Sequence, residues 1–111
     1  MKKHALTRGD KVLKSSEYRS ILKGGKSTNT EHFKVFICPN QLKKQRLGIT
    51  TSRRVGTAAK RNRIKRFLRE YFRLNRVCLP PSSDILFIAK PGADTLDYKG
   101  LRAELKDVFC G

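Results

Sequence analysis

The residues with the clearest chemistry are the cations between Arg53 and Arg76 and the amide of Asn62 among them. This segment carries eight Arg, two Lys and only one acid, Glu70. Guanidinium groups bind phosphate oxygens in a planar, bidentate way, and an amide can bond a phosphate, a ribose hydroxyl or a base edge. The composition therefore predicts binding of a polyanion. The candidate residues are Arg53, Arg54, Lys60, Arg61, Asn62, Arg63, Lys65, Arg66, Arg69 and Arg73.

A second candidate binding surface follows from the alternation between Phe33 and Cys38. Phe33, Val35 and Ile37 fall on one face of a predicted strand, and Lys34 and Phe36 fall on the other. An aromatic ring beside a cation on an open strand face can stack a nucleic-acid base. The alternative is that a helix, for example the one carrying Tyr18, covers Phe36, and the sequence does not decide between the two.

Catalysis by the protein itself is not predicted. The nine acids are scattered singly, whereas a metal-dependent nuclease needs converging carboxylates. Asp94 and Asp97 are nearest to a pair, but Asp97 is better explained as a helix cap. His4 and His32 are expected to have ordinary surface roles. Cys38, Cys78 and Cys110 lie far apart, which indicates reduced thiols and no zinc site.

The basic segment is predicted to form an amphipathic helix. Ile64, Phe67, Leu68, Tyr71 and Phe72 recur at the spacing that places side chains on one helical face. The cations gather on the opposite face, where only Glu70 is available to pair, with Arg66 or Arg73. A merely solvated helix face normally balances its charges through pairs of opposite sign. Because the cations on this helix face outnumber the acids that could pair with them, the sequence favours an anionic binding partner.

The whole chain fits one small RNA-binding domain spanning residues 1–111. Its 26 Lys and Arg against 9 Asp and Glu give a net charge of +17, in the range typical of nucleic-acid binding. Residues 1–10 are expected to be a flexible basic arm. They lack the apolar core of a secretory signal, and no apolar run is long enough to span a bilayer. We therefore expect a cytoplasmic protein without a membrane partner.

The remaining patterns predict an α+β domain of order α-β-β-α-β-α. A first helix begins at Ser15 or Ser16 and ends at Gly24-Gly25, and a last helix begins around Asp97. Arg46 to Ser52 is expected to be the antiparallel return strand after residues 33–38. The apolar run from Asp84 to Ala89 suits a central strand covered on both sides. Residues 26–31 add at most a short edge strand.

The stretch from Arg46 to Arg69 closely resembles the signature of the bacterial ribonuclease P protein subunit. Its most specific part is Arg61-Asn62-Arg63 followed by Lys65-Arg66. The resemblance implies a single-domain α/β sandwich of order α-β-β-β-α-β-α with a mixed sheet. It also implies a left-handed β-α-β crossover, as in the second domain of the fifth protein of the small ribosomal subunit. General topology alone favours the right-handed form.

By this resemblance the protein is the noncatalytic subunit of a ribonucleoprotein that removes the 5′ leader of precursor tRNA. The catalytic RNA would use magnesium ions, and the protein itself would bind no cofactor and be monomeric when free. Its partners would be the catalytic RNA and precursor tRNA, with Tyr18, Leu22, Lys34 and Phe36 in a leader-binding cleft. The alternatives are a ribosomal or chaperone-like RNA-binding protein and, less favoured, a protein nuclease using Asp94 or Asp97.

Overall fold

The computed structural model of the chain describes residues 15–109, so the expected basic arm at residues 1–10 lies outside the described part. The seven-element order implied by the resemblance is confirmed, and a short 3-10 helix is added before the last α-helix. In chain order the elements are α1 (Ser15–Gly24), β1 (Lys26–Asn29), β2 (Phe33–Pro39), β3 (Arg46–Thr50), α2 (Ala58–Leu74), β4 (Ser83–Ala89), η2 (Ala93–Thr95) and α3 (Tyr98–Phe109).

The strands form one mixed sheet of order β1-β2-β4-β3. β2 pairs antiparallel with both β1 and β4, whereas β3 pairs parallel with β4. β1 is therefore the short edge strand that the sequence allowed. β3 runs antiparallel to β2 as expected, but the two strands are not neighbours, because β4 lies between them. β4 is buried along nearly its whole length and so takes an interior position, whereas β3, ending at the exposed Thr50, takes the edge.

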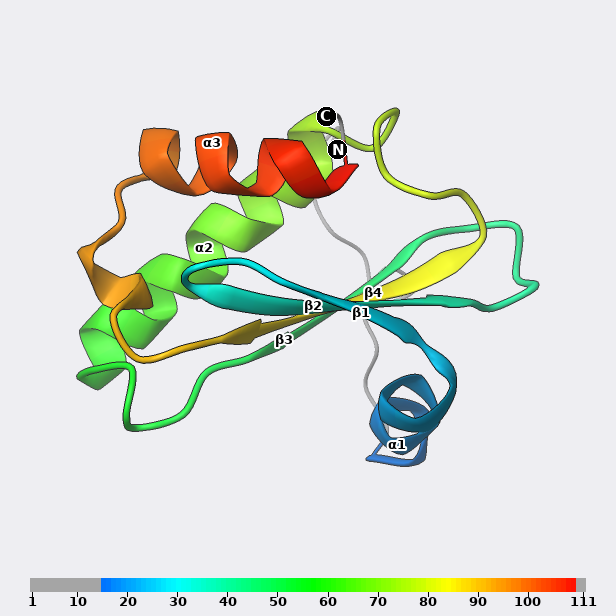
Figure 1. Ribbon diagram of the computed structural model, residues 1–111, viewed down its shortest axis with the longest axis horizontal. Coiled ribbons are helices and arrows are strands. Elements are labelled where there is room, and N and C mark those ends of the chain that lie inside the picture. Colours follow the sequence, from blue (N-terminus) through cyan, green and yellow to red (C-terminus); the bar gives the residue numbers. More distant parts are fainter. Residues whose placement is uncertain (1–14, 110–111) are drawn as a thin grey trace, which may run out of the picture.

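Helices cover both faces of the sheet (Figure 1). α2 and α3 lie on one face, and α1 lies on the other. The face under α2 and α3 carries the main core, in which Phe33, Val35 and Phe87 are fully buried. A smaller cluster under α1 joins Ile21 to Phe36 and Leu86. The chain is thus a mixed α+β single domain, as predicted.

The connection β3-α2-β4 joins two parallel neighbouring strands through the basic helix. This crossover places α2 against the sheet and leaves its outer side at the surface. The left-handed sense of this β3-α2-β4 crossover stays a prediction from the resemblance. Within residues 15–109, no helix combines the length and the apolar character needed to cross a bilayer.

Candidate nucleic-acid interface

The apolar stripe of α2 fixes which side of the helix faces outward. Ile64, Leu68, Tyr71 and Phe72 are buried against the sheet, as the spacing predicted. The helix begins after Thr57, whose hydroxyl oxygen accepts a hydrogen bond from the backbone N–H of Lys60 at 3.3 Å. This hydrogen bond caps the helix, and it satisfies one of the free N–H groups of the first turn. Burial of the stripe therefore holds the opposite, cationic side toward solvent.

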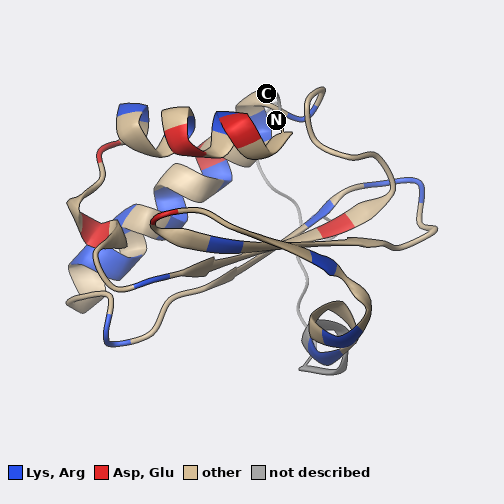
Figure 2. Cartoon of the chain, viewed as in Figure 1, with Lys and Arg blue, Asp and Glu red and all other residues tan. Residues whose placement is uncertain are grey.

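Lys and Arg recur along the whole length of α2 (Figure 2). Two of them have acidic partners: Arg73 donates to Glu70 at 2.7 Å, and Lys60 lies 3.5 Å from Asp94. The Glu70–Arg73 pair was among those predicted from the sequence, whereas the Lys60–Asp94 pair was not. Seven other cations have no ion-pair partner among residues 15–109. They are Arg53, Arg54, Arg61, Arg63, Lys65, Arg66 and Arg69.

The first turn of α2 carries cations at the positive end of the helix dipole, and Asp94 is the acid that lies beside Lys60 there. The turn itself contains no acid, although the positive end of a helix dipole favours negative charge there. Lys60 and Arg61 occupy this turn instead, and the Nε atom of Arg61 is buried without a hydrogen-bond partner. An anion bound here would relieve both penalties. Asn62 is exposed on the same turn and is free to contact a ligand, as expected.

Aromatic contacts hold part of the cationic surface in place. The guanidinium carbon of Arg63 lies 5.1 Å from the ring centroid of Phe67, which in turn makes an edge contact with Tyr98. The hydrogen bond from Arg73 is the main cause that lowers the pKa of Glu70. Burial is the main cause that raises the pKa of Tyr98. Glu70 is therefore ionised and Tyr98 neutral at physiological pH, so Tyr98 adds no charge to the cationic surface.

The structure decides the open question at Phe36. Its side chain is only 7% exposed, and it packs with Ile21 of α1 and Leu86 of β4. Of the two alternatives, the structure shows the covered ring, because α1 docks on this part of the sheet; the assignment of Phe36 to a leader-binding cleft stays a prediction. Lys34 stays half-buried with its ammonium 5.2 Å from the Phe36 ring centroid, and Leu22 is 47% exposed. The side chain of Tyr18 lies outside the described side chains.

Beside α1, one row of residues crosses the sheet on the same face as Phe36. The strand register aligns Asn29 with Lys34, Lys34 with Ile88, and Ile88 with Thr50. Asn29 and Thr50 are exposed, and Lys34 and Ile88 are half-buried. We call these four residues the open sheet face. Sequence reasoning found only Lys34, because the other three become neighbours through pairing of distant strands.

Five of the described acids are engaged in structural contacts. Asp97 caps α3 by accepting from the N–H of Gly100 at 2.7 Å, as predicted, and Asp94 pairs with Lys60. The other three are Glu70, bound by Arg73; Asp84, bound by Arg46 at 2.7 Å; and Glu104, bound by His32 at 2.6 Å. No three His, Cys, Asp or Glu side chains gather within residues 15–109. Cys38 and Cys78 are free thiols.

Comparison with known proteins decides the family. The family described as Ribonuclease P matches residues 6–110. The chain belongs to the ribonuclease P protein family. The ribonuclease P protein component of Syntrophus aciditrophicus is 40% identical over 105 residues, covering 95% of this chain and 88% of that relative. That of Desulfosudis oleivorans is 42% identical over 100 residues, covering 90% and 83%.

Solved structures of ribonuclease P proteins share the fold. The protein of Staphylococcus aureus superposes with a TM-score of 0.83 at 31% identity, covering 89% of this chain and 91% of that one. The protein of Thermotoga maritima gives a TM-score of 0.81, also at 31% identity, covering 89% and 94%. Membership of the ribonuclease P family implies a part in that holoenzyme and partnership with its RNA. The ribosomal or chaperone-like alternative is not favoured.

Proposed function

We propose that this chain is the noncatalytic protein subunit of ribonuclease P and that the outer side of α2 binds the catalytic RNA. The observation that carries the proposal is the group of seven Lys and Arg without acidic partners on α2 and the loop before it. Their mutual repulsion destabilises the free protein, so a bound polyanion stabilises the fold. Together with Asn62, Lys60 and Arg73 they form the proposed RNA-binding surface.

The chemistry of cleavage belongs to the RNA in this proposal. Magnesium ions bind oxygen ligands, and carboxylates converging on one point are the usual protein source. Asp84, Asp94, Asp97 and Glu104 instead hold separate parts of the fold together. The carboxylates of the described part of the chain therefore do not fit a magnesium site, and the ions needed for hydrolysis would be held by the RNA. The protein supplies charge neutralisation and substrate binding in the cytoplasm.

The 5′ leader of precursor tRNA would cross the open sheet face beside α1. Lys34 offers a cation for a leader phosphate, and Leu22 and Ile88 offer partly exposed apolar contacts. Phe36 lies beneath as support for α1 and for the Lys34 ammonium. Tyr18 is proposed as a leader contact from the family resemblance. A precursor would then bind more tightly than mature tRNA, because only the precursor has a leader.

Cleavage of precursor tRNA at low magnesium concentration tests the proposal. The catalytic RNA alone should cleave slowly there, and adding this protein as a monomer should restore cleavage. The protein free of RNA should not cleave. Magnesium-dependent cleavage by RNA-free protein would contradict the assignment of catalysis to the RNA. An equal increase in the binding of precursor and mature tRNA would contradict the assignment of leader binding to the protein.

A further inference from the structure

A groove between the end of α2 and the side of α3 forms a further candidate site. It has a volume of about 270 Å³, and its lining residues are Tyr71, Asn75, Arg102 and Lys106. The two helices lie on the same face of the sheet (Figure 1). None of the four lining residues is acidic, and neither the proposed RNA-binding surface of α2 nor the open sheet face includes them.

Packing and hydrogen bonds fix the wall of this groove on the α2 side. The Tyr71 side chain is 1% exposed, and its ring centroid lies 6.2 Å from that of Phe109 at the end of α3. The carbonyl oxygen of Tyr71 accepts a hydrogen bond from the backbone N–H of Asn75 at 3.0 Å and another from the Asn75 amide at 2.9 Å. Carbonyl oxygens at the end of a helix normally disfavour an anion, but this one is already bound twice.

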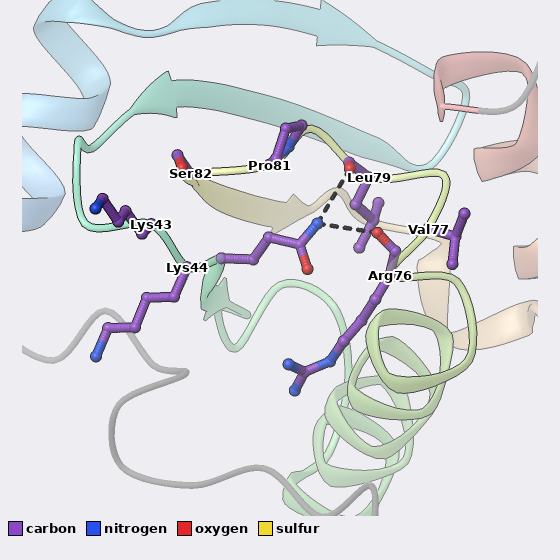
Figure 3. Close-up of a pocket in the computed structure, with 8 residues that line it drawn as sticks. Lys43, Lys44, Arg76, Val77, Leu79, Pro81 and Ser82 are labelled. Carbon is purple, nitrogen blue, oxygen red and sulfur yellow. Dashed lines mark hydrogen bonds between the residues drawn. The ribbon is translucent and has the colours of Figure 1, made fainter.

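The turn after α2 is held in place from its other side as well. The Gln45 amide of the β2–β3 loop lies 3.0 Å from the carbonyl oxygen of Arg76 (Figure 3). This contact closes a separate pocket beside Lys43 and Lys44, which is not part of the groove. Asn75 therefore lies between two anchored segments, and the groove is built into the fold.

The charges around the groove favour an anion. Arg102 and Lys106 are exposed and lie one helical turn apart, about 6 Å along the axis of α3, so a single anion can contact both. Neither has an ion-pair partner in the part of the chain from 15 to 109. The Glu70 carboxylate is bound by Arg73, and Asp107 lines a different hollow beside the β1–β2 turn. The groove therefore presents cations without a competing carboxylate among the residues that line it.

The groove continues the cationic side of α2. Burial is the main cause that raises the pKa of Tyr98, and the Glu70 charge adds to it, whereas the charges of Arg102 and Arg73 oppose it. Arg73 on α2 and Arg102 on α3 thus face the same seam between the two helices. The cationic surface therefore extends from α2 onto α3.

We propose that this groove binds a phosphate group of an RNA backbone, with Arg102 and Lys106 as the cationic contacts and the second amide N–H of Asn75 as a neutral donor. The inference rests on the proposed function, because it extends the same RNA–protein contact onto α3. Asn75 lies about 18 Å from Arg63 along the axis of α2. Two phosphate contacts that far apart fix the direction in which an RNA strand or helix lies along the protein. The phosphate comes from either the catalytic RNA or precursor tRNA.

Paired substitutions in α3 test the site. We compare Arg102→Ala/Lys106→Ala with Lys26→Ala/Lys99→Ala, which removes the same charge from exposed residues that do not line the groove. Affinity for the catalytic RNA is measured from about 50 to 200 mM salt, and affinity of the assembled holoenzyme for precursor tRNA is measured over the same range. The groove variant should lose about 1 unit of the slope of log K against log salt in one of these arms, because one phosphate is no longer neutralised. The arm that changes identifies the source of the phosphate.

A variant that keeps both charges separates phosphate binding from an effect on the fold. Arg102→Lys/Lys106→Arg should retain the slope of the parent, and circular dichroism should show unchanged helix content, because Ala, Lys and Arg are all good helix formers. Slopes of the groove variant that equal those of the control in both arms overturn the inference. An equal loss of slope in the charge-conserving variant also overturns it, because the effect would then not depend on charge.

The parent protein in the same samples reports on the proposed function separately, through cleavage of precursor tRNA at low magnesium. Failure of the parent there counts against the proposed function. Normal cleavage by the parent, with no difference between the groove variant and its control, counts against the groove alone.

Discussion

Truncation of Phe36 separates a structural role from a stacking role for this ring. Phe36 is 7% exposed and lies between Ile21 of α1 and Leu86 of β4. Phe→Ala changes at buried sites cost about 3–5 kcal/mol, depending on how far the surroundings collapse. The cluster under α1 is small, and α1 can settle toward the sheet, so the lower end of that range applies. We therefore expect Phe36→Ala to reduce the free energy of unfolding by about 3 kcal/mol.

Urea unfolding followed by circular dichroism measures this loss, and a thermal scan should show a fall in Tm of roughly 10–20 °C. Phe36→Leu is the matched variant, because it keeps an apolar side chain in the cluster but removes the aromatic ring. It should retain most of the stability and nearly all of the preference for precursor over mature tRNA.

Two results would refute the reasoning about Phe36. A Phe36→Ala protein within about 1 kcal/mol of the parent would show that the ring is not a packing element. A Phe36→Leu protein that is stable but no longer prefers precursor tRNA would show that the ring stacks on a base after all.

Three further predictions follow from single contacts. Burial opposes ionisation of Glu104, but hydrogen bonds from His32 and Thr30 outweigh it and lower the pKa of Glu104. The parent protein should therefore be more stable than Glu104→Gln above a pH of about 4.5. This difference in unfolding free energy should shrink as the pH is lowered below that value and Glu104 becomes protonated. Thr57→Ala should cost about 1 kcal/mol of unfolding free energy by removing the cap of α2, whereas Thr57→Ser should cost little. Asp84→Asn should cost about 3 kcal/mol, because it removes the charged partner from a largely buried ion pair with Arg46; stability unchanged in urea would contradict this.

Local patterns were sufficient to predict the basic helix and its orientation. The spacing of Ile64, Leu68 and Tyr71 determines the buried side of α2, and the position of the cations follows from it. The capping roles of Thr57 and Asp97 depend on residues within three positions, so they were also predictable.

Contacts between distant segments were not predictable in the same way. The sequence shows that β2 and β3 run in opposite directions, but not that β4 inserts between them. Alternation places Phe36 on one face without saying what covers that face. His32 and Glu104 are 72 positions apart, and the pocket at Lys43 and Lys44 exists only because Gln45 reaches the turn after α2.

The salt dependence of binding to the catalytic RNA tests the central claim most directly. Arg61→Ala/Arg63→Ala/Arg66→Ala should be compared with the parent and with Lys23→Ala/Lys26→Ala/Lys99→Ala, which removes three exposed lysines elsewhere. If the outer side of α2 contacts RNA phosphates, the arginine variant should lose about 2–3 units of the slope of log K against log salt, and the lysine variant should change little. Equal slopes for the parent and the arginine variant would contradict the assignment of α2 as the RNA-binding surface.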